Sequence, residues 1–316
     1  MRYNMDRFHG IFPALNAVYD EEGNVNESAL RKLANWYKEK GVHGLYVCGS
    51  TGEGIVMSLE ERKKTVEILT DEVGDSLTLI VHVGAPATKD SIELAKHAAA
   101  HGAHGTSAVS SVYYGLSEEG IAAHWNAIAD AADLPFFIYN IPTLTNFALT
   151  PALFTKMLEN ERVCGLKNTA MPCMDMTIFK NLAPEGFVIF NGPDEQLAAG
   201  LAMGADGGIG GTYGLMPEVY LVIYKLMQMG AYKEAFEVQK KTTLIIVNDL
   251  LVLGSLYSTA KMIIKARSGI DIGDARMPLP RVDRTSPKAQ ALVQKIEDHV
   301  AYAQDVLAEC EKKYNA

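Results

Sequence analysis

Three short segments of the chain carry residue types that can do chemistry. They are Gly-Ser-Thr-Gly-Glu at Gly49–Glu53, Tyr-Asn-Ile-Pro at Tyr139–Pro142 and Gly-Leu-Lys-Asn-Thr at Gly165–Thr169. Each segment follows or closes a short apolar run, which is typical of a buried β-strand. Each therefore places a reactive or polar side chain where a predicted strand ends.

Lys167 ends one of these strands, between Leu166 and Asn168. A lysine in a folded core is costly unless its amine is neutral or paired, and a neutral amine facing a cleft is a nucleophile for carbonyl carbon. Tyr139 ends a neighbouring strand, and its phenol is suited to carry the protons that such a reaction moves. The alternatives are a surface lysine and an aromatic ring that only packs.

Two polar loops complete the set of candidate residues. Gly49–Glu53 is bracketed by glycines, and the backbone N–H groups of such a loop can hold a carboxylate. It lacks the Gly-Lys-Ser/Thr ending of a phosphate loop. Asp194 and Glu195 follow another strand and can accept hydrogen bonds from hydroxyl groups, or can simply favour the N-terminus of a helix.

Strand and helix patterns alternate along most of the chain. The strand-like runs are Gly10–Ala17, Gly44–Cys48, Leu77–Val83, Gly105–Ser110, Pro135–Ile141, Val163–Leu166, Phe187–Asn191 and Gly207–Gly211. Eight strands alternating with helices predict an α/β protein with a (β/α)8 barrel. The alternative is a doubly wound sheet, but its usual Gly-x-Gly-x-x-Gly after the first strand is absent. We expect residues 1–230 to form the barrel and 231–316 a helical extension packed on it.

Local signals mark the beginnings of several helices. Ser58 and Glu61 form a predicted capping box, and Thr150 precedes a proline at a first helical position. Asp90 and Ser117 are the predicted caps of two further helices.

In a (β/α)8 barrel, functional residues gather at the C-terminal ends of the strands. The candidate residues that should meet there are Ser50, Thr51, Tyr139, Lys167, Asp194, Glu195 and Gly211. Their convergence on one mouth depends only on the placement of the strands.

Taken together, the motifs resemble those of the pyruvate-dependent class I aldolases in the N-acetylneuraminate lyase and dihydrodipicolinate synthase family. The resemblance runs from about Phe8 to Gly211 and continues more weakly through the C-terminal helices. It implies that Lys167 forms a Schiff base with pyruvate and that Tyr139 relays protons to and from the substrate. The lysine pKa must then be lowered by desolvation, since an ammonium group cannot attack a carbonyl.

The resemblance also assigns the remaining site residues. Ser50 and Thr51 would hold the carboxylate of pyruvate, and Tyr113, from a neighbouring subunit, would join the proton relay. The alternative for Tyr113 is an interface aromatic with no proton role. Substrate-binding roles are implied for Thr169, Gly192, Asp194, Glu195 and Gly211.

Two positions bear on the substrate. Leu144 stands where the dihydrodipicolinate synthases usually carry an arginine for a second carboxylate, which favours a polyhydroxylated substrate. The implied reaction is reversible cleavage of N-acetylneuraminate, a sialic acid, to N-acetylmannosamine and pyruvate. Gly211 stands where sialic acid lyases usually have a serine, which puts the identity of the sugar in doubt.

Several alternatives therefore stay open. A 4-hydroxy-tetrahydrodipicolinate synthase or another keto-sugar-acid aldolase or dehydratase would use the same scaffold. A barrel that binds a small acid without catalysis is the alternative that is not an enzyme, and the presence of Lys167, Tyr139 and Thr51 together argues against it. The family resemblance and the role of Tyr113 imply a homo-oligomer, for which we expect a homotetramer.

Composition narrows the partners and the location. The formal net charge of −9 argues against nucleic acids and anionic membranes, because phosphates need basic surfaces to neutralise them. No signal peptide or membrane-length apolar run is visible. Cys48, Cys164, Cys173 and Cys310 lack disulfide or metal spacing, so we expect free thiols in a cytoplasmic protein.

Three histidines suggest a metal site, but the predicted helix end argues against one. His97, His101 and His104 approach helical spacing, yet Gly102 should end that helix before His104, on the outer ring of the barrel. We expect solvated histidines, no metal and no cofactor.

Overall fold

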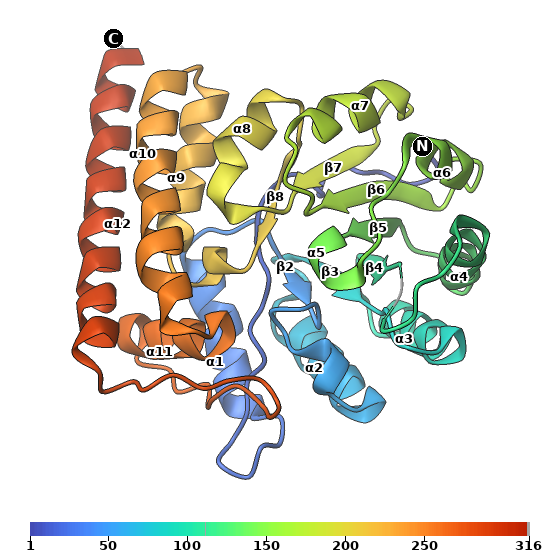
Figure 1. Cartoon of the computed structure of the whole chain (residues 1–316), viewed down its shortest axis with the longest axis horizontal. Coiled ribbons are helices and arrows are strands. Elements are labelled where there is room, and N and C mark those ends of the chain that lie inside the picture. The colour runs from blue at the N-terminus through green and yellow to red at the C-terminus, as the bar shows by residue number, and fades with distance from the viewer. Residues whose placement is uncertain (111, 315–316) are drawn as a thin grey trace.

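The structure is a computed structural model that describes residues 1–110 and 112–314, and eight parallel strands in that part of the chain form a barrel. The strands are β1 (Gly10–Pro13), β2 (Gly44–Val47), β3 (Thr78–His82), β4 (Gly105–Val109), β5 (Phe136–Asn140), β6 (Val163–Asn168), β7 (Val188–Asn191) and β8 (Gly207–Gly210). They are paired in the order β1-β8-β7-β6-β5-β4-β3-β2. A parallel bridge from Ala14 to Tyr46 joins β1 to β2, so the sheet nearly closes (Figure 1). The predicted barrel is confirmed, and the doubly wound alternative is wrong.

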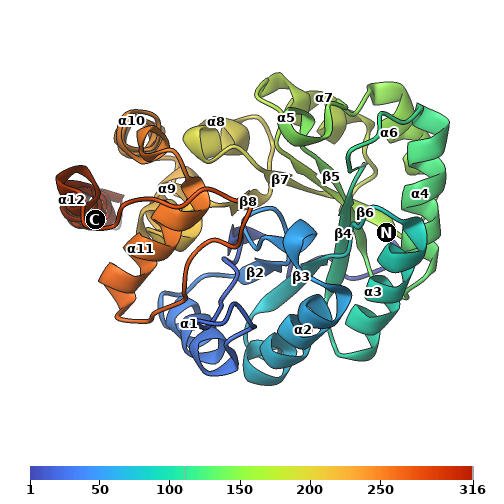
Figure 2. The same ribbon diagram turned by 60° about the horizontal axis from the view of Figure 1, so that its bottom comes forward.

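A ring of helices covers the outside of the strands, as Figure 2 shows. The helices between and after the strands are α1 (Glu27–Glu39), α2 (Leu59–Val73), α3 (Thr88–Ala100), α4 (Glu118–Asp130), α5 (Pro142–Thr145), α6 (Pro151–Met157), α7 (Met174–Leu182), α8 (Leu197–Ala202) and α9 (Pro217–Gln228). The C-terminal helices are α10 (Tyr232–Ile245), α11 (Leu256–Ser268) and α12 (Pro287–Tyr314). Short helical turns at Ile246–Leu250 and Leu251–Leu253 extend α10.

Most helix starts follow their local signals. The Ser58 hydroxyl accepts a hydrogen bond from the Glu61 backbone N–H, and the Glu61 carboxylate accepts one from the Ser58 N–H, which confirms the capping box. Thr150 and Ser117 cap α6 and α4 as predicted. The predicted cap at Asp90 is wrong, because α3 already begins at Thr88 and Asp90 lies in its first turn. An acid there still interacts favourably with the helix dipole.

The barrel interior is filled by aromatic rings packed against glycines. Phe12, Phe137 and Phe190 are fully buried there. A Cβ added to Gly44 would lie 2.2 Å from the Phe12 ring, and one added to Gly165 would lie 2.1 Å from the Phe137 ring. These two strand positions therefore have no room for a side chain, and the rings supply the volume that close packing requires.

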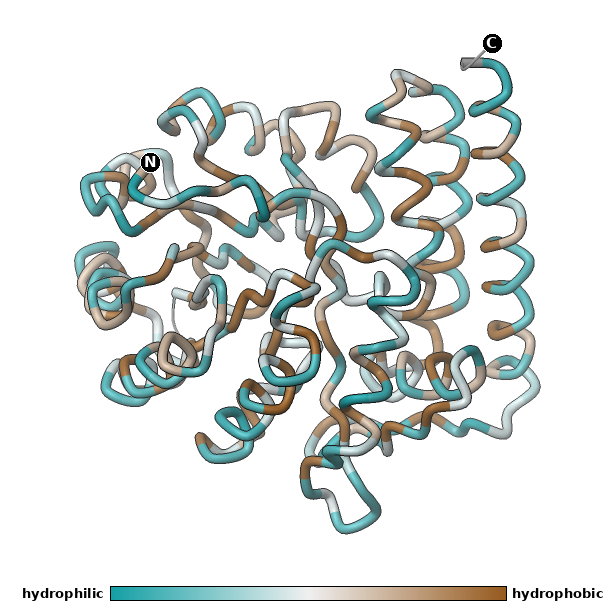
Figure 3. The backbone as a smooth tube through the Cα atoms, turned by 180° about the vertical axis from the view of Figure 1, so that it is seen from behind, coloured by the Kyte–Doolittle hydropathy of each residue, from teal (hydrophilic) through white to brown (hydrophobic). Residues whose placement is uncertain are grey.

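A second, larger apolar layer lies between the strands and the helices. Along the helices of Figure 3, hydrophilic and hydrophobic colours alternate, as expected where one face of a helix is buried. In Figure 1, α12 runs beside α10, and α9 lies next to both. The division at residue 230 stays a prediction, and residues 315–316 of the predicted extension lie outside the described part.

Among the described residues no single helix has the length and apolar character to cross a membrane, although the bent pair Tyr232–Leu253 and Leu256–Ser268 passes that test when taken together.

A buried ion pair ties α11 to the loop after β2. Lys261 Nζ lies 2.7 Å from Glu53 Oε1, and both side chains have 0% exposure. Lys261 also donates to the carbonyl of Asp274 at 2.8 Å, and Glu53 Oε2 accepts from the Arg276 backbone N–H at 2.8 Å. The C-terminal segment therefore holds the end of the Gly49–Glu53 loop in place.

The ion pair gives a stability prediction. Lys261→Ala should lower the free energy of unfolding by about 3–5 kcal/mol, because it leaves the Glu53 carboxylate buried without its partner. Lys265→Ala is the matched control on the same helix, where Lys265 pairs with Asp271 at half-exposed positions. The control should cost at most about 1 kcal/mol. Urea unfolding of both variants would measure the difference, and equal losses would contradict the prediction.

Candidate active site

The Lys167 amine lies over the ring of Tyr139 at one end of the barrel. The two residues are register partners on the parallel strands β6 and β5. Lys167 Nζ lies 4.1 Å from the centroid of the Tyr139 ring and 4.3 Å from that of the Tyr46 ring. Only 4% of Lys167 is exposed, so the amine sits between two aromatic faces with little access to water.

Burial gives Lys167 an unusual protonation equilibrium. Desolvation lowers the pKa of its amine to about 7, and the carboxyl group of Asp194 opposes the shift by favouring the charged form. Near pH 7, a large fraction of the amine is therefore neutral. The amine then has the lone pair that attack on a carbonyl carbon requires.

Tyr139 is equally buried, with the opposite consequence for its proton. Burial raises the pKa of Tyr139 to about 12, while hydrogen bonds from the side chains of Ser50 and Thr169 favour the phenolate and lower it. At neutral pH the phenol keeps its proton. The phenol is therefore suited to pass a proton along a chain of hydroxyl groups, and it is not a deprotonated general base in the resting protein.

The Gly49–Glu53 loop follows β2 in a tight, constrained turn. Cys48 and Glu53 both have left-handed backbone angles, with φ of 57° and 55°. A Cβ on the next residue, Gly54, would lie 2.0 Å from the carbonyl oxygen of Cys48, so only glycine fits. Ser50 is half-buried and Thr51 is buried within this turn. Such strain is often held at functional sites.

Asp194 follows β7, and one of its two carboxyl oxygens is already hydrogen-bonded within the protein. Its Oδ2 accepts hydrogen bonds from the Thr212 backbone N–H at 2.6 Å and the Thr212 hydroxyl at 2.7 Å. Burial and the neighbouring Glu195 raise its pKa to about 7, against the effect of the Thr212 hydrogen bonds. Glu195 is half-buried. The expected acidic pair is therefore unequal, since Asp194 has only Oδ1 left for a ligand.

Gly192 and Thr169 lie against each other beside this acid. The Gly192 N–H donates to the carbonyl of Asn168 at 2.8 Å, and a Cβ at Gly192 would lie 2.0 Å from Thr169 Oγ1. Thr169 Oγ1 is buried, and apart from the Tyr139 phenol beside it no hydrogen-bonding group satisfies it among the residues that the structure describes. Buried hydroxyls are normally satisfied, so this one is available to a ligand.

Gly211 joins the same cluster from the end of β8. Its φ is −71°, which every residue type adopts. A Cβ there would lie 3.0 Å from Thr51 Oγ1 and 3.9 Å from Asp194 Oδ2. The ends of β2, β7 and β8 therefore converge, as the barrel prediction requires.

A cavity of about 260 Å³ opens above the ends of β2, β3, β4 and β5, and neither Lys167 nor Asp194 is among the residues that line it. Ser50 and Leu144 line it, and so do Tyr257 and Leu279 from the C-terminal segment. Tyr113 also borders it, with 93% of the residue exposed and its ring 5.0 Å from that of Tyr114. In the single chain, Tyr113 stands at the rim, away from the buried centre.

Tyr46, His82 and Ser107 also belong to this site, although no sequence motif singled them out. The Tyr46 hydroxyl donates to Ser107 Oγ at 3.0 Å, and the His82 ring lies 5.8 Å from the Tyr139 ring. Burial holds the pKa of His82 well below its usual range, so the ring is neutral. The available signal was the period-2 alternation that turns Tyr46 inward on β2 and His82 inward on β3.

The three histidines lie elsewhere. His97 lies on α3 and His101 directly follows that helix, on the outer ring, while His104 accepts a hydrogen bond from the Leu79 N–H. None of them joins the residues at the strand ends. The expectation that they are solvated is incomplete for His97, whose side chain is only 13% exposed.

Comparisons with known proteins agree with this geometry. Residues 7–297 match the model of the dihydrodipicolinate synthetase family. An N-acetylneuraminate lyase from Mediterraneibacter gnavus is 40% identical over 312 residues, covering 98% of this chain and 96% of that protein. N-acetylneuraminate lyase 2 from Escherichia coli O6:H1 is 37% identical, over 87% of this chain and 90% of its own. The solved structure of a catalytic lysine mutant of Ruminococcus gnavus sialic acid aldolase superposes with a TM-score of 0.90 at 39% identity, covering 96% and 98% of the two chains.

The pKa of Lys167 predicts how its reactivity depends on pH. The rate of adduct formation with pyruvate, trapped by cyanoborohydride, should rise with pH up to about 7 and then level off, because the neutral amine becomes the main form. Mass spectrometry should locate the adduct on Lys167. Exposed Lys265 in the same sample serves as the internal control and should stay unlabelled. An adduct on another lysine, or a rate that still climbs at high pH, would exclude the assignment.

Proposed function

This chain belongs to the dihydrodipicolinate synthetase family, and we propose that it is a Schiff-base aldolase that cleaves N-acetylneuraminate reversibly to N-acetylmannosamine and pyruvate. The observation that carries the proposal is the buried amine of Lys167 at the mouth of the barrel, whose pKa is lowered to about 7 by desolvation. The relatives named as N-acetylneuraminate lyases support the choice of substrate. The catalytic lysine named for the Ruminococcus gnavus aldolase supports the choice of chemistry.

The reaction begins when the neutral amine of Lys167 attacks the keto carbon of the open-chain sugar acid. Loss of water leaves a protonated imine, which withdraws electrons from the adjacent carbon. The carbon–carbon bond one position further along then breaks: the hydroxyl on the departing carbon loses its proton and becomes the aldehyde of N-acetylmannosamine, and the electron pair of the broken bond forms an enamine. Protonation of the enamine carbon and hydrolysis of the imine release pyruvate and free the lysine. The faces of Tyr46 and Tyr139, 4.3 and 4.1 Å from Nζ, favour the positive charge of the imine.

Protons must move at several of these steps. Tyr139, with the hydroxyls of Ser50 and Thr169 beside it, provides the relay from the imine carbon to the hydroxyl group that becomes the aldehyde. We propose that Tyr113 of a neighbouring subunit extends this relay in a homotetramer. Its exposed ring at the rim of the cavity supports that role, because a partner chain could cover it.

The other residues at the strand ends serve recognition. Ser50 and Thr51 hold the substrate carboxylate with the backbone N–H groups of their loop. Thr169 Oγ1, Asp194 Oδ1, Glu195 and the backbone around Gly192 and Gly211 face the hydroxylated tail. Leu144 at the cavity wall offers no charge for a second carboxylate. These residues favour a polyhydroxylated substrate over an amino-acid semialdehyde.

We also propose a cytoplasmic location, supported by the four free cysteines. The proposed chemistry requires no cofactor, since the lysine itself supplies the electron sink.

A substrate panel tests the proposed function. Purified protein should release pyruvate from N-acetylneuraminate in preference to shorter keto-deoxy sugar acids, and should not condense pyruvate with aspartate semialdehyde. A coupled pyruvate assay measures all three. Clear preference for another compound would refute the substrate while leaving the imine chemistry in place.

Gly211→Ser refines the same experiment. The negative φ of Gly211 accepts a side chain, and the new hydroxyl would restore a hydrogen bond worth roughly 1 kcal/mol, or several-fold in the Michaelis constant for N-acetylneuraminate. Gly211→Ala is the matched control, because its Cβ meets Thr51 Oγ1 at 3.0 Å without adding a donor. A lower Michaelis constant in the serine variant alone is expected. Equal effects of both variants would mean that only crowding is measured.

Tyr139→Phe tests the proton relay. It keeps the ring beside Lys167 and removes the hydroxyl, so turnover should fall by about 100-fold or more. Steady-state kinetics and circular dichroism would separate catalytic loss from misfolding. Near-normal turnover would leave Tyr139 as a packing residue and transfer the relay to Tyr113 or Thr51.

A further inference from the structure

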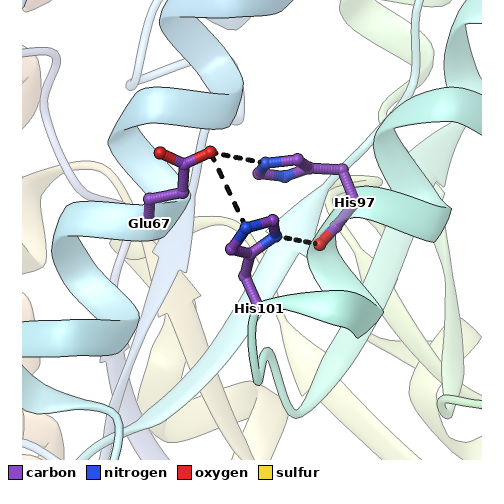
Figure 4. Close-up of side chains that lie close together, drawn as sticks. All are labelled: Glu67, His97 and His101. Atoms are coloured by element: carbon purple, nitrogen blue, oxygen red, sulfur yellow. Dashed lines mark hydrogen bonds and ion pairs between the residues drawn. The ribbon is translucent and has the colours of Figure 1, made fainter.

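A compact group of three side chains lies on the outer ring of the barrel, away from the mouth. Figure 4 shows Glu67 of α2 facing His97 of α3 and His101, the residue that follows α3. Glu67 Oε1 lies 2.8 Å from His97 Nε2 and 3.8 Å from His101 Nε2. One oxygen of a carboxylate and two imidazole nitrogens thus point at the same small volume.

Regular spacing brings these residues together. Residues four apart lie on the same helix face, so Glu93, His97 and His101 form one row and Lys63 and Glu67 form the facing row on α2. The neighbouring step of this ladder is an ordinary ion pair, in which Lys63 Nζ lies 2.6 Å from Glu93 Oε1. The step at Glu67 differs, because its carboxylate faces two imidazole rings, whereas the Glu93 carboxylate faces the single amine of Lys63.

The hydrogen bonds of His101 indicate where its lone pair lies. His101 Nδ1 lies 2.9 Å from the backbone carbonyl oxygen of His97, which only accepts hydrogen bonds, so Nδ1 carries the hydrogen. In the neutral ring, Nε2 then has a free lone pair. That lone pair faces Glu67 Oε1, which is also an acceptor.

The two imidazoles lie close together beside the carboxylate. The rings of His97 and His101 are stacked with centroids 4.0 Å apart and planes 26° apart. The Nε2 atom of each ring faces Glu67 Oε1, at 2.8 and 3.8 Å. A cation among the three atoms would interact with all of them at once.

We propose that Glu67, His97 and His101 bind one divalent transition-metal ion of the zinc type. The three ligand atoms all lie within 4.8 Å of one another. Zinc–nitrogen bonds of about 2.0–2.1 Å place tetrahedral ligands roughly 3.3 Å apart, between the two distances from Glu67 Oε1 to the imidazoles. Water would supply the fourth ligand, and imidazole ligands select zinc, nickel or copper over magnesium or calcium.

The surroundings of the site support this assignment. The hydrogen bond from His101 Nδ1 to the His97 carbonyl is the usual outer contact of a metal-binding histidine, and it fixes the ring with Nε2 toward the metal. The His97 side chain is 13% exposed and that of His101 is 41% exposed, so the site is open to ions from solution. The metal would join α2 to the end of α3 and would stabilise the folded barrel without touching the reacting atoms.

Zinc titration of untagged, chelator-treated protein tests the proposal. Calorimetry should give one Zn²⁺ per chain, and the melting temperature should rise by about 2 °C when free zinc is ten times its dissociation constant. His101→Gln and Glu67→Gln should each weaken zinc binding by at least about tenfold, since each removes one ligand. His9→Gln, which changes an exposed histidine outside the group, is the matched control and should bind zinc like the parent.

Two outcomes would overturn the proposal. If the parent protein shows no saturable zinc binding, or if His101→Gln binds zinc as tightly as the parent, Glu67 and His97 form only an ion pair like the Lys63–Glu93 step. Turnover of the metal-free protein should equal that of the zinc-loaded protein. A loss of turnover on zinc removal would show that the bound metal has a catalytic role and would refute the structural one.

Discussion

The whole site depends on the burial of one amine. Lys167 and Lys261 are both buried, but the protein handles them differently. Lys261 lies 2.7 Å from the Glu53 carboxylate and keeps a counter-charge, whereas Lys167 Nζ is flanked by the aromatic faces of Tyr46 and Tyr139. Desolvation outweighs the effect of the Asp194 carboxyl group and lowers the pKa of Lys167 to about 7. Lys261 therefore stabilises the fold, and Lys167 is available for reaction.

The C-terminal helices take part in the site as well as covering the barrel. Tyr257 at the start of α11 lines the cavity, and the side chain of Leu256 comes within 3.8 Å of a Cβ placed on Gly211. The Lys261–Glu53 ion pair, one turn further along α11, fixes the loop that carries Ser50 and Thr51. The barrel mouth is therefore shaped by segments more than two hundred residues apart in the chain.

Local signals predicted the fold well, and distant contacts limited the prediction of the site. Strand runs and the caps at Ser58, Ser117 and Thr150 follow from neighbouring residues, so the sequence was enough to predict them. The cap at Asp90 failed because the helix started two residues earlier without any capping side chain. Tyr46 and His82 were missed because inward-facing residues inside a strand look like core. The grouping of Glu67 with His97 joins two helices thirty residues apart, and no single helical pattern reveals it.

The phenylalanine–glycine contacts inside the barrel limit how this protein can change over evolution or in the laboratory. Because a Cβ at Gly44 or Gly165 would run into the ring of Phe12 or Phe137, neither glycine can be replaced while its ring stays. Trimming a ring alone would open a void beneath the reactive amine. A Cβ at Gly44 would also lie 2.3 Å from the backbone carbonyl oxygen of Thr78, which a smaller residue at position 12 would not move, so this position must stay glycine. At Gly165 the nearest atoms all belong to the Phe137 ring, so sequence drift at these two positions must be correlated. Relatives with a bulkier residue at position 165 should carry a smaller one at position 137, which makes this pair a natural marker for aligning distant barrels of this kind.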